Sequence, residues 1–214
     1  MHFLSEQLQE YVNAHTQDEP ELLRNLRKET LQRVLQPRML SGHFQGRVLS
    51  LFSKLQKPKN ILEIGTYTGY ATLCLAEGLA PDGTLHTIDN NSELQSIQQK
   101  YFKASAFGNQ IRSHLGNALE IIPKLPDFLD LVFIDADKQN YANYFQLVMR
   151  KMSKGGLIIS DNVLWSGKVL ADKAQKKDAT TQALIDYNML LKNDPRVETI
   201  LLPIRDGLTV CRIL

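Results

Sequence analysis

The sequence predicts an α/β protein built on a mostly parallel sheet, with helices on both faces and an antiparallel last strand. From Pro58 onward, short apolar runs alternate with stretches of helical periodicity, which is typical of parallel strands joined by helices. The Asp206-Gly207 pair separates the last two apolar runs and indicates a hairpin. The 214 residues, 43% hydrophobic and 22% charged, suffice for one large domain with a buried core.

The N-terminal part, residues 1–55, is predicted to be a helical extension of the same domain. Helical periodicity covers three segments, Glu6–His15, Glu21–Leu35 and His43–Leu55. Ser5 is placed to cap the first helix, and Pro37 separates the second from the third. An apolar stripe runs along the second helix, formed by Leu22, Leu23, Leu26 and Leu31. It either packs on the chain's own sheet or contributes to an interface between two copies, and we expect a homodimer.

The rest of the chain, residues 58–214, is predicted to be the sheet-forming core. Its strands are expected at Asn60–Ile64, Thr84–Ile88, Gln110–His114, Leu129–Ile134, Gly156–Ser160, Glu198–Pro203 and Leu208–Leu214. Its helices are expected at Tyr70–Leu79, Ser92–Ala106, Ala118–Leu125, Asn140–Met152 and near Thr180–Asn193. Lys168–Lys177, rich in lysine, is expected to be a solvated loop or a lid. No repeat or low-complexity linker divides the chain, so residues 1–214 are predicted to form a single domain.

Charge and cysteine usage exclude several classes of protein. Lys and Arg number 25 against 23 for Asp and Glu, and the net charge of +2 does not favour nucleic-acid binding. Cys74 and Cys211 lie among apolar residues without metal-ligand spacing, as expected of a reduced, intracellular protein. The N-terminus lacks the pattern of a signal peptide, and the apolar runs are far shorter than a membrane span. We therefore expect a soluble cytoplasmic protein without a membrane partner.

A strand, a glycine turn and a helix follow one another in Asn60–Tyr70. Gly65 allows a tight turn and the close approach of a ligand. The spacing from Gly65 to Gly69 differs from the Gly-x-Gly-x-x-Gly of dinucleotide sites, which disfavours a nicotinamide-dependent oxidoreductase. The carboxylate of Glu63, at the strand end, would repel a diphosphate and attract a cationic amino-acid group.

Asp89 closes the next predicted strand, 24 residues after Gly65. An acid at this place can accept both hydroxyls of a ribose. A glycine turn can also exist for packing alone, but together with Asp89 it favours a nucleoside site.

Oxygen-bearing side chains follow two further strands. Asp135 and Asp137 come after the strand ending at Ile134, and Asp161 and Asn162 follow the next strand. Asp135, Asp161 and Asn162 can converge between neighbouring strand ends, where their oxygens suit Mg²⁺, Mn²⁺ or Ca²⁺. No His or Cys is near, which argues against zinc. Such acids can also serve only as caps, but two facing one crevice favour a metal.

These motifs resemble those of a known family. Leu62–Tyr70, Phe133–Lys138, Asp161–Gly167 and Pro203–Thr209 resemble, in order and spacing, the metal-dependent O-methyltransferases that use S-adenosylmethionine. The most similar branch is the caffeoyl-CoA O-methyltransferase-like one with its bacterial members, and catechol O-methyltransferase is more distant. The resemblance runs from about Met39 to residue 214. It implies a Rossmann-like class I methyltransferase fold, a seven-stranded sheet with a reversed last strand, and residues 58–214 as the cofactor-binding catalytic core.

The resemblance also implies roles for individual residues. Glu63 and Gly65 would hold the methionine end of the cofactor, Asp89 its ribose and the Ala118 backbone its adenine. The cofactor pocket would be completed by Ser41, Thr66, Ala71 and Asp137. Asp135, Asp161 and Asn162 match the metal ligands, so Asp135 is also a catalytic residue. Trp165 and Ser166 would contact the substrate, although a lone Trp is equally typical of a core.

Lys138 falls where catechol O-methyltransferase carries its proposed general base. The alternative is a plain ion pair with Asp135 or Asp137. Three departures from the family pattern remain: Ala71 stands for Ser, Asn117 for Asp, and Ser166 for the Asn of plant members. The last puts the acyl-CoA substrate of the plant enzymes in doubt.

The expected function is therefore methyl transfer from S-adenosylmethionine to a hydroxyl of a catechol-like or other vicinal-diol aromatic molecule, with a divalent metal. A diol can chelate the cation, which lowers the phenol pKa and fixes the geometry of attack. The alternatives are an oxidoreductase on a related sheet, a non-catalytic binding protein, and methylation of RNA or protein.

Overall fold

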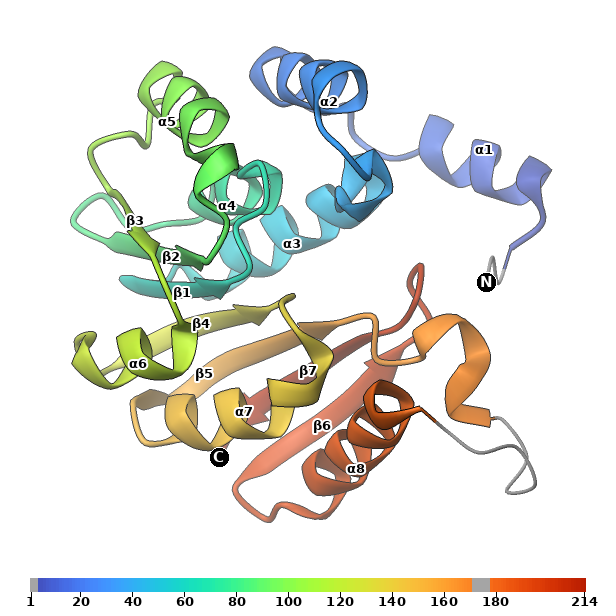
Figure 1. Ribbon diagram of the computed structural model, residues 1–214, viewed down its shortest axis with the longest axis vertical. Helices are drawn as coiled ribbons and strands as arrows, with labels where there is room; N and C mark the ends of the chain where they lie inside the picture. The colour runs from blue at the N-terminus through green and yellow to red at the C-terminus, as the bar shows by residue number, and fades with distance from the viewer. Residues whose placement is uncertain (1–3, 171–177) are drawn as a thin grey trace.

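The computed structural model describes residues 4–170 and 178–214 (Figure 1). Most of the stretch Lys168–Lys177, expected to be a loop or lid, lies outside the described residues. No helix in the described part of the chain is long and apolar enough to cross a membrane.

Seven strands form one sheet in the order β3-β2-β1-β4-β5-β7-β6. They are β1 (Asn60–Ile64), β2 (Thr84–Asp89), β3 (Ile111–Leu115), β4 (Leu129–Ile134), β5 (Met152–Asp161), β6 (Val197–Leu202) and β7 (Leu208–Ile213). The pairs from β3 to β5 are parallel, whereas β7 is antiparallel to both β5 and β6. The predicted mostly parallel sheet with a reversed last strand is confirmed.

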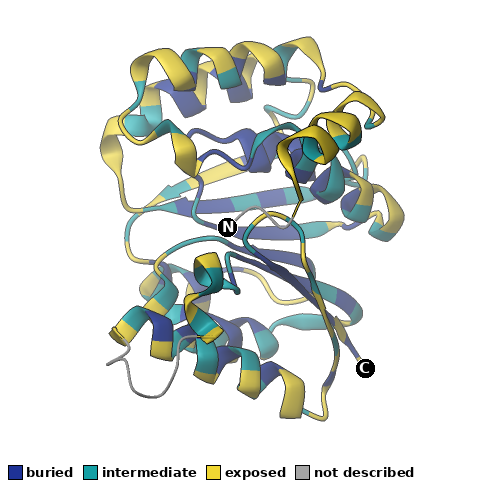
Figure 2. Cartoon of the chain, turned by 90° about the vertical axis from the view of Figure 1, so that its right-hand side faces the viewer, coloured by how far each residue is buried: buried dark blue, intermediate teal, exposed yellow. Residues whose placement is uncertain are grey.

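Helices cover both faces of this sheet, as predicted (Figure 1). They are α1 (Glu6–Ala14), α2 (Glu21–Arg33), α3 (Gly42–Gln56), α4 (Tyr70–Ala76), α5 (Gln95–Ala104), α6 (Ala118–Ile121), α7 (Tyr141–Met149) and α8 (Ala179–Asn193). Helices α2 to α5 pack on one face, and α6 to α8 pack on the other. The buried positions lie along the sheet and on the inner sides of these helices (Figure 2). The apolar side chains thus form two cores, one on each face.

The prediction was wrong at one helix-to-strand boundary. Met152 was expected to end a helix, but α7 stops at Met149 and Met152 begins β5, where it pairs with Leu129. Two consecutive glycines, Gly155 and Gly156, are typical of a turn that ends a strand or precedes one. In the structure Gly155 has φ of +78°, which glycine adopts at little cost, and the strand continues through it.

Within the N-terminal part, α2 and α3 belong to the packed domain. Leu23 and Leu26 are buried in the core against α4 and α5, whereas Leu31 is exposed. Leu22 packs against the same core, so three of the four residues of the predicted stripe pack on the chain's own domain, which is the alternative to an interface. Helix α1 has no buried residue.

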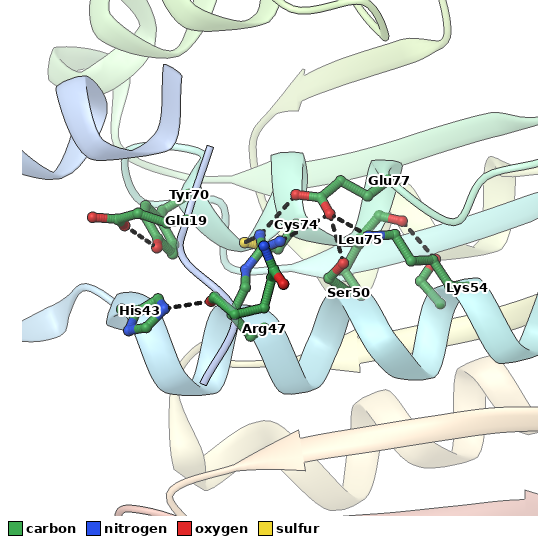
Figure 3. A network of polar contacts seen from close by, with 11 residues as sticks. Glu19, His43, Arg47, Ser50, Lys54, Tyr70, Cys74, Leu75 and Glu77 are labelled. Atoms are coloured by element: carbon green, nitrogen blue, oxygen red, sulfur yellow. Dashed lines mark hydrogen bonds and ion pairs between the residues drawn. The ribbon is translucent and has the colours of Figure 1, made fainter. Parts of the chain in front are cut away.

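A polar network fixes α3 against α4 (Figure 3). Arg47 donates to both carboxylate oxygens of Glu77, at 3.0 and 2.7 Å, and Ser50 and Lys54 donate to the same group. Burial opposes ionisation, but these partners hold the pKa of Glu77 down at about 2. At the other end of α4, the Tyr70 hydroxyl donates to Glu19 at 2.5 Å. Helix α4 is thus held at both ends, directly after the glycine turn.

Candidate active site

A cleft opens at the carboxyl ends of the parallel strands. The strand order reverses between β1 and β4, and open α/β sheets bind ligands at such a point. All predicted site residues except Glu63 line it: Ser41, Gly65, Thr66, Ala71, Asp89, Ala118, Asp135, Asp137, Lys138, Asp161, Asn162, Trp165 and Ser166. The fold therefore brings residues at or just after five strand ends, together with Ser41 just before α3, into one cleft.

The glycine turn lies against the end of β4. Gly65 has φ of +102°, and a Cβ there would lie 2.1 Å from the carbonyl oxygen of Asp135. The Gly65 N–H donates to the Ile88 carbonyl at 2.9 Å, which joins the turn to β2. Only glycine fits this position, for its conformation as well as for its space.

Asp89 lies at the end of β2 and half-faces the cleft. Its Oδ2 accepts the backbone N–H of Tyr67 at 2.7 Å, and its Oδ1 accepts that of Asn91 at 2.8 Å. The carboxylate is thereby oriented by the glycine turn on one side and its own loop on the other. Each oxygen keeps a lone pair for a further donor, such as a ribose hydroxyl.

On the neighbouring wall, Ala118 is the first residue of α6. The Asn117 side chain caps this helix by accepting the N–H of Leu119 at 3.0 Å. Asn thus serves as the cap where the family pattern has Asp.

Glu63 lies beneath the cleft rather than on its wall. The side chain is 0% exposed, and its Oε2 accepts the hydroxyls of Thr72 and Thr87, the latter at 2.5 Å. Thr87 in turn is 2.5 Å from the hydroxyl of Thr66 in the glycine turn. Burial raises the pKa of Glu63 to about 8 despite these hydrogen bonds. Through Oε2 the carboxyl group supports the turn from below, whereas its Oε1 is buried without a partner among the described residues.

Asp135, Asp161 and Asn162 line the cleft at the ends of β4 and β5. Asp161 is 2% exposed, and burial, followed by the nearby charge of Asp135, raises its pKa to about 6. Asn162 follows with φ of +58°, a left-handed conformation that Asn tolerates better than most residues. Its backbone N–H donates to Oδ1 of Asp161 at 2.7 Å. Two carboxylates that repel one another beside an amide are suited to a hard cation.

Acidic, histidine and cysteine side chains do not gather in groups of three or more within residues 4–170 and 178–214. Asp135, Asp161 and Asn162 are two acids and one amide, so they do not form such a group.

Lys138 lies between Asp135 and α7. Its Nζ is 2.8 Å from Oδ1 of Asp135 and donates to the Tyr141 hydroxyl at 2.7 Å. Tyr141 is fully buried and its hydroxyl donates to the Asp161 carbonyl at 3.0 Å. Tyr141 was not predicted as a site residue, although its spacing of three residues from Lys138 is one that brings helical side chains together.

Asp137 points its carboxylate toward α7. Tyr144 and Asn140 each donate to one of its oxygens. Burial, and next the hydrogen bond to Asp137, raise the pKa of Tyr144 above its usual value.

The loop after β5 forms the outer wall. Trp165 and Ser166 have φ of 48° and 53°, and the Ser166 N–H donates to Asp206 at 2.5 Å. Trp165 packs against the core and also lines the cleft. Its indole N–H is buried without a partner among the described residues.

Two further residues join this site without any motif in the sequence. Gln45 of α3 donates to Asp161, and Arg205 of the β6–β7 hairpin donates to Gln45. Gln45 lies 116 residues before Asp161, and Arg205 lies 160 residues after Gln45. Only the fold therefore shows that these residues meet.

Comparison with known proteins gives concordant matches. A family model described as O-methyltransferase matches residues 13–214. The chain is 36% identical over 208 residues to a caffeoyl-CoA O-methyltransferase of Petroselinum crispum, and the alignment covers 91% of this chain and 84% of that protein. It is similar to the SAH-bound methyltransferase PaMTH1 of Podospora anserina, with a TM-score of 0.90 and 26% identity over 100% of this chain and 98% of that one. An O-methyltransferase from Bacillus cereus in complex with SAH gives a TM-score of 0.88 and 26% identity, with 97% of both chains covered.

Proposed function

The chain belongs to the O-methyltransferase family, and from that premise we propose that it transfers a methyl group from S-adenosylmethionine to a hydroxyl of a catechol-like or other vicinal-diol aromatic molecule. We propose further that the reaction depends on a divalent cation, Mg²⁺ or Mn²⁺ by preference. The observation that carries this is one cleft lined by Gly65 and Asp89 as well as by Asp135, Asp161 and Asn162.

The cofactor side of the cleft fits an adenosyl amino acid. The Gly65 turn packs so closely against the Asp135 backbone that no Cβ would fit, and Asp89 presents two oriented carboxylate oxygens. Ser41, Thr66, Ala71, Ala118 and Asp137 line the same space. SAH-bound relatives of this fold support the assignment. When bound, S-adenosylmethionine supplies an electrophilic methyl group.

The cluster of Asp135, Asp161 and Asn162 fits a divalent cation by the chemistry of its donors. The two carboxylates and the amide all line the cleft at neighbouring strand ends and are oxygen donors of the kind that a divalent cation prefers. A divalent cation bound there supplies Lewis acidity to a substrate hydroxyl. Hard oxygen donors without His or Cys favour Mg²⁺, Mn²⁺ or Ca²⁺.

The chain's own residues would then position the acceptor and take up its proton. Lys138 is the proton acceptor in this proposal, at Nζ, and Asp135 and Tyr141 hold that atom in place. Trp165 and Ser166 form the outer wall and would orient an aromatic ring and limit the access of water. Alignment of the hydroxyl with the methyl group is the main contribution of such a wall.

A direct methyl-transfer assay tests the function. The purified protein, labelled S-adenosylmethionine and Mg²⁺ are incubated with catechols, matching monophenols and hydroxycinnamoyl thioesters. Labelled catechol with little labelled monophenol is the expected result. Labelling of RNA or protein alone would move the chain to the rival substrate classes, and binding of NAD⁺ but not S-adenosylhomocysteine would indicate an oxidoreductase.

We also propose that the protein is a cytoplasmic homodimer. The exposed apolar residues of α1, with Leu8 54% and Tyr11 62% exposed, support a partner for this helix. The free, buried state of Cys74 and Cys211 supports a reducing compartment. A monomeric mass in solution at micromolar concentration would refute the dimer.

A further inference from the structure

The buried amide of Gln45 lies between two groups of opposite charge. Gln45 is 0% exposed on α3, and its Nε2 donates to Oδ2 of Asp161 at 2.6 Å. Its Oε1 accepts from Nη1 of Arg205 at 2.8 Å. The side chain therefore connects a cation in the β6–β7 hairpin with an anion at the end of β5.

Chemistry allows this amide only one orientation. Arginine carries donors and no acceptor, so the amide oxygen must face Arg205. The NH₂ group must then face Asp161, because an oxygen there would be repelled by the carboxylate. Arg205 thereby determines which end of Gln45 reaches Asp161.

Arg205 is itself held in place. The same Nη1 donates to the backbone carbonyl of Ser41, just before α3. Its neighbour Asp206 accepts from Ser166 and, through its carbonyl, from the Leu164 N–H at 2.9 Å. The hairpin, the loop after β5 and the start of α3 thus form one connected support around Asp161.

Both oxygens of Asp161 accept a donor in this arrangement. Gln45 binds Oδ2, and the Asn162 N–H binds Oδ1 at 2.7 Å. The carboxylate is buried and cannot rely on water to set its rotation. Partners outside the ligand set commonly orient metal ligands in this way, and their loss lowers metal affinity by about 10–100-fold.

We propose that Gln45, oriented by Arg205, is a positioning residue that fixes the carboxylate of Asp161 for a divalent cation. This inference rests on the proposed metal dependence. It makes α3 and the β6–β7 hairpin parts of the metal site, although neither supplies a predicted ligand. The alternative is that Gln45 only packs α3 onto the sheet.

The test measures Mn²⁺ affinity by the electron paramagnetic resonance of free Mn²⁺, and S-adenosylhomocysteine affinity by calorimetry, on the full chain. The variants are Gln45→Leu, Arg205→Met and the double variant. Gln56→Leu is the matched control, because Gln56 lies on the same helix and donates to another element, the Gly155 carbonyl. Asp161→Ala marks the loss of a ligand.

Gln45→Leu is expected to weaken Mn²⁺ binding by about 10-fold or more, with S-adenosylhomocysteine affinity within about twofold of wild type. Arg205→Met should weaken Mn²⁺ binding less than Gln45→Leu does. The double variant should be no weaker than Gln45→Leu, because Arg205 acts through Gln45. Arg205→Lys, which keeps a cationic donor, should recover most of the affinity lost in Arg205→Met. Gln56→Leu should match wild type.

Wild-type Mn²⁺ affinity in Gln45→Leu, or equal losses for Mn²⁺ and S-adenosylhomocysteine, would overturn the positioning role and leave the proposed function standing. If wild type itself bound no Mn²⁺ and Asp161→Ala changed nothing, the metal dependence would fail, and this inference with it. If Gln45→Leu does not fold, the Arg205→Met variant tests the proposal instead. Wild-type Mn²⁺ affinity in Arg205→Met would then refute it.

Discussion

Nζ of Lys138 lies 2.8 Å from Oδ1 of Asp135, so the predicted proton acceptor is paired with a predicted metal ligand. The ion pair that was the alternative role for Lys138 is therefore present in the structure. It does not exclude proton transfer, because a divalent cation bound beside Lys138 would favour the neutral amine, which is the form that can accept a proton.

Replacement of Lys138 distinguishes the two roles. Lys138→Ala should lower kcat by about 10² or more if the amine is the base. Lys138→Arg is the matched variant, because a guanidinium keeps the ion pair with Asp135 but does not accept a proton at neutral pH. Steady-state rates with a catechol acceptor decide the matter. Near-normal turnover in Lys138→Arg would leave only the ion-pair role.

Removal of the metal should abolish turnover. Activity is expected to vanish in excess EDTA and to return with Mg²⁺ or Mn²⁺, since the acceptor hydroxyl would lose its Lewis acid. Asp161→Ala should abolish turnover as well, while leaving S-adenosylmethionine affinity nearly intact. Full activity of the purified protein in EDTA would contradict the metal dependence.

The cofactor should bind without metal. Asp89→Ala and Glu63→Ala are each expected to weaken S-adenosylmethionine binding about tenfold or more, or about 1.4 kcal/mol. The physical reasons differ, because Asp89 faces the cleft whereas Glu63 supports the turn through Thr87 and Thr66. Calorimetry in EDTA measures this. Asp82→Ala, at an exposed acid paired with Lys59, is the control, and wild-type affinity in both test variants would refute the assignment.

Glu63 should make stability depend on pH. Its pKa is about 8 in the folded chain against an ordinary 4.5, so between these values the folded state holds one proton more than the unfolded state. Wild-type stability should therefore fall as pH rises through this window, by about 1.4 kcal/mol per pH unit at most from this group.

Glu63→Gln removes that titration and keeps the neutral shape. In denaturant unfolding from pH 5 to pH 8, the variant should gain stability relative to wild type as pH rises. The raised pKa of Asp161 acts in both proteins and cancels from the difference. A difference that stays constant over this range would show that Glu63 is ionised in the fold.

The elements of the fold could be predicted because each has a local pattern. Strand β1 and its glycine turn are marked by an apolar run followed by Gly65, and the last two strands by the Asp206-Gly207 turn. Strand β5 was predicted too short, because the conformation that Gly155 adopts depends on its neighbours in the sheet and not on its own residue type.

The site could be predicted where its residues follow strand ends. Asp89, Asp135 and Asp161 all have this position, and parallel strands bring such ends to one edge. Glu63 also lies near the end of a strand. Side chains alternate between the two faces of a strand, however, and the Glu63 side chain is buried beside Thr72 and Thr87. Gln45 could not be predicted, because its only signal is a polar residue on an apolar helix face.

Among the strands of the described residues, β6 has β7 as its only neighbour in the sheet, although it precedes β7 in the chain. During synthesis, β6 therefore has no strand to pair with until Leu208–Ile213 has been synthesised and has paired with β5. Strands β1 to β3, which lead into Gly65, Asp89 and Ala118, are all made earlier. Pairings between distant segments form late and slowly. The surroundings of Asp161 at the end of β5 should thus be among the last parts of the molecule to become ordered.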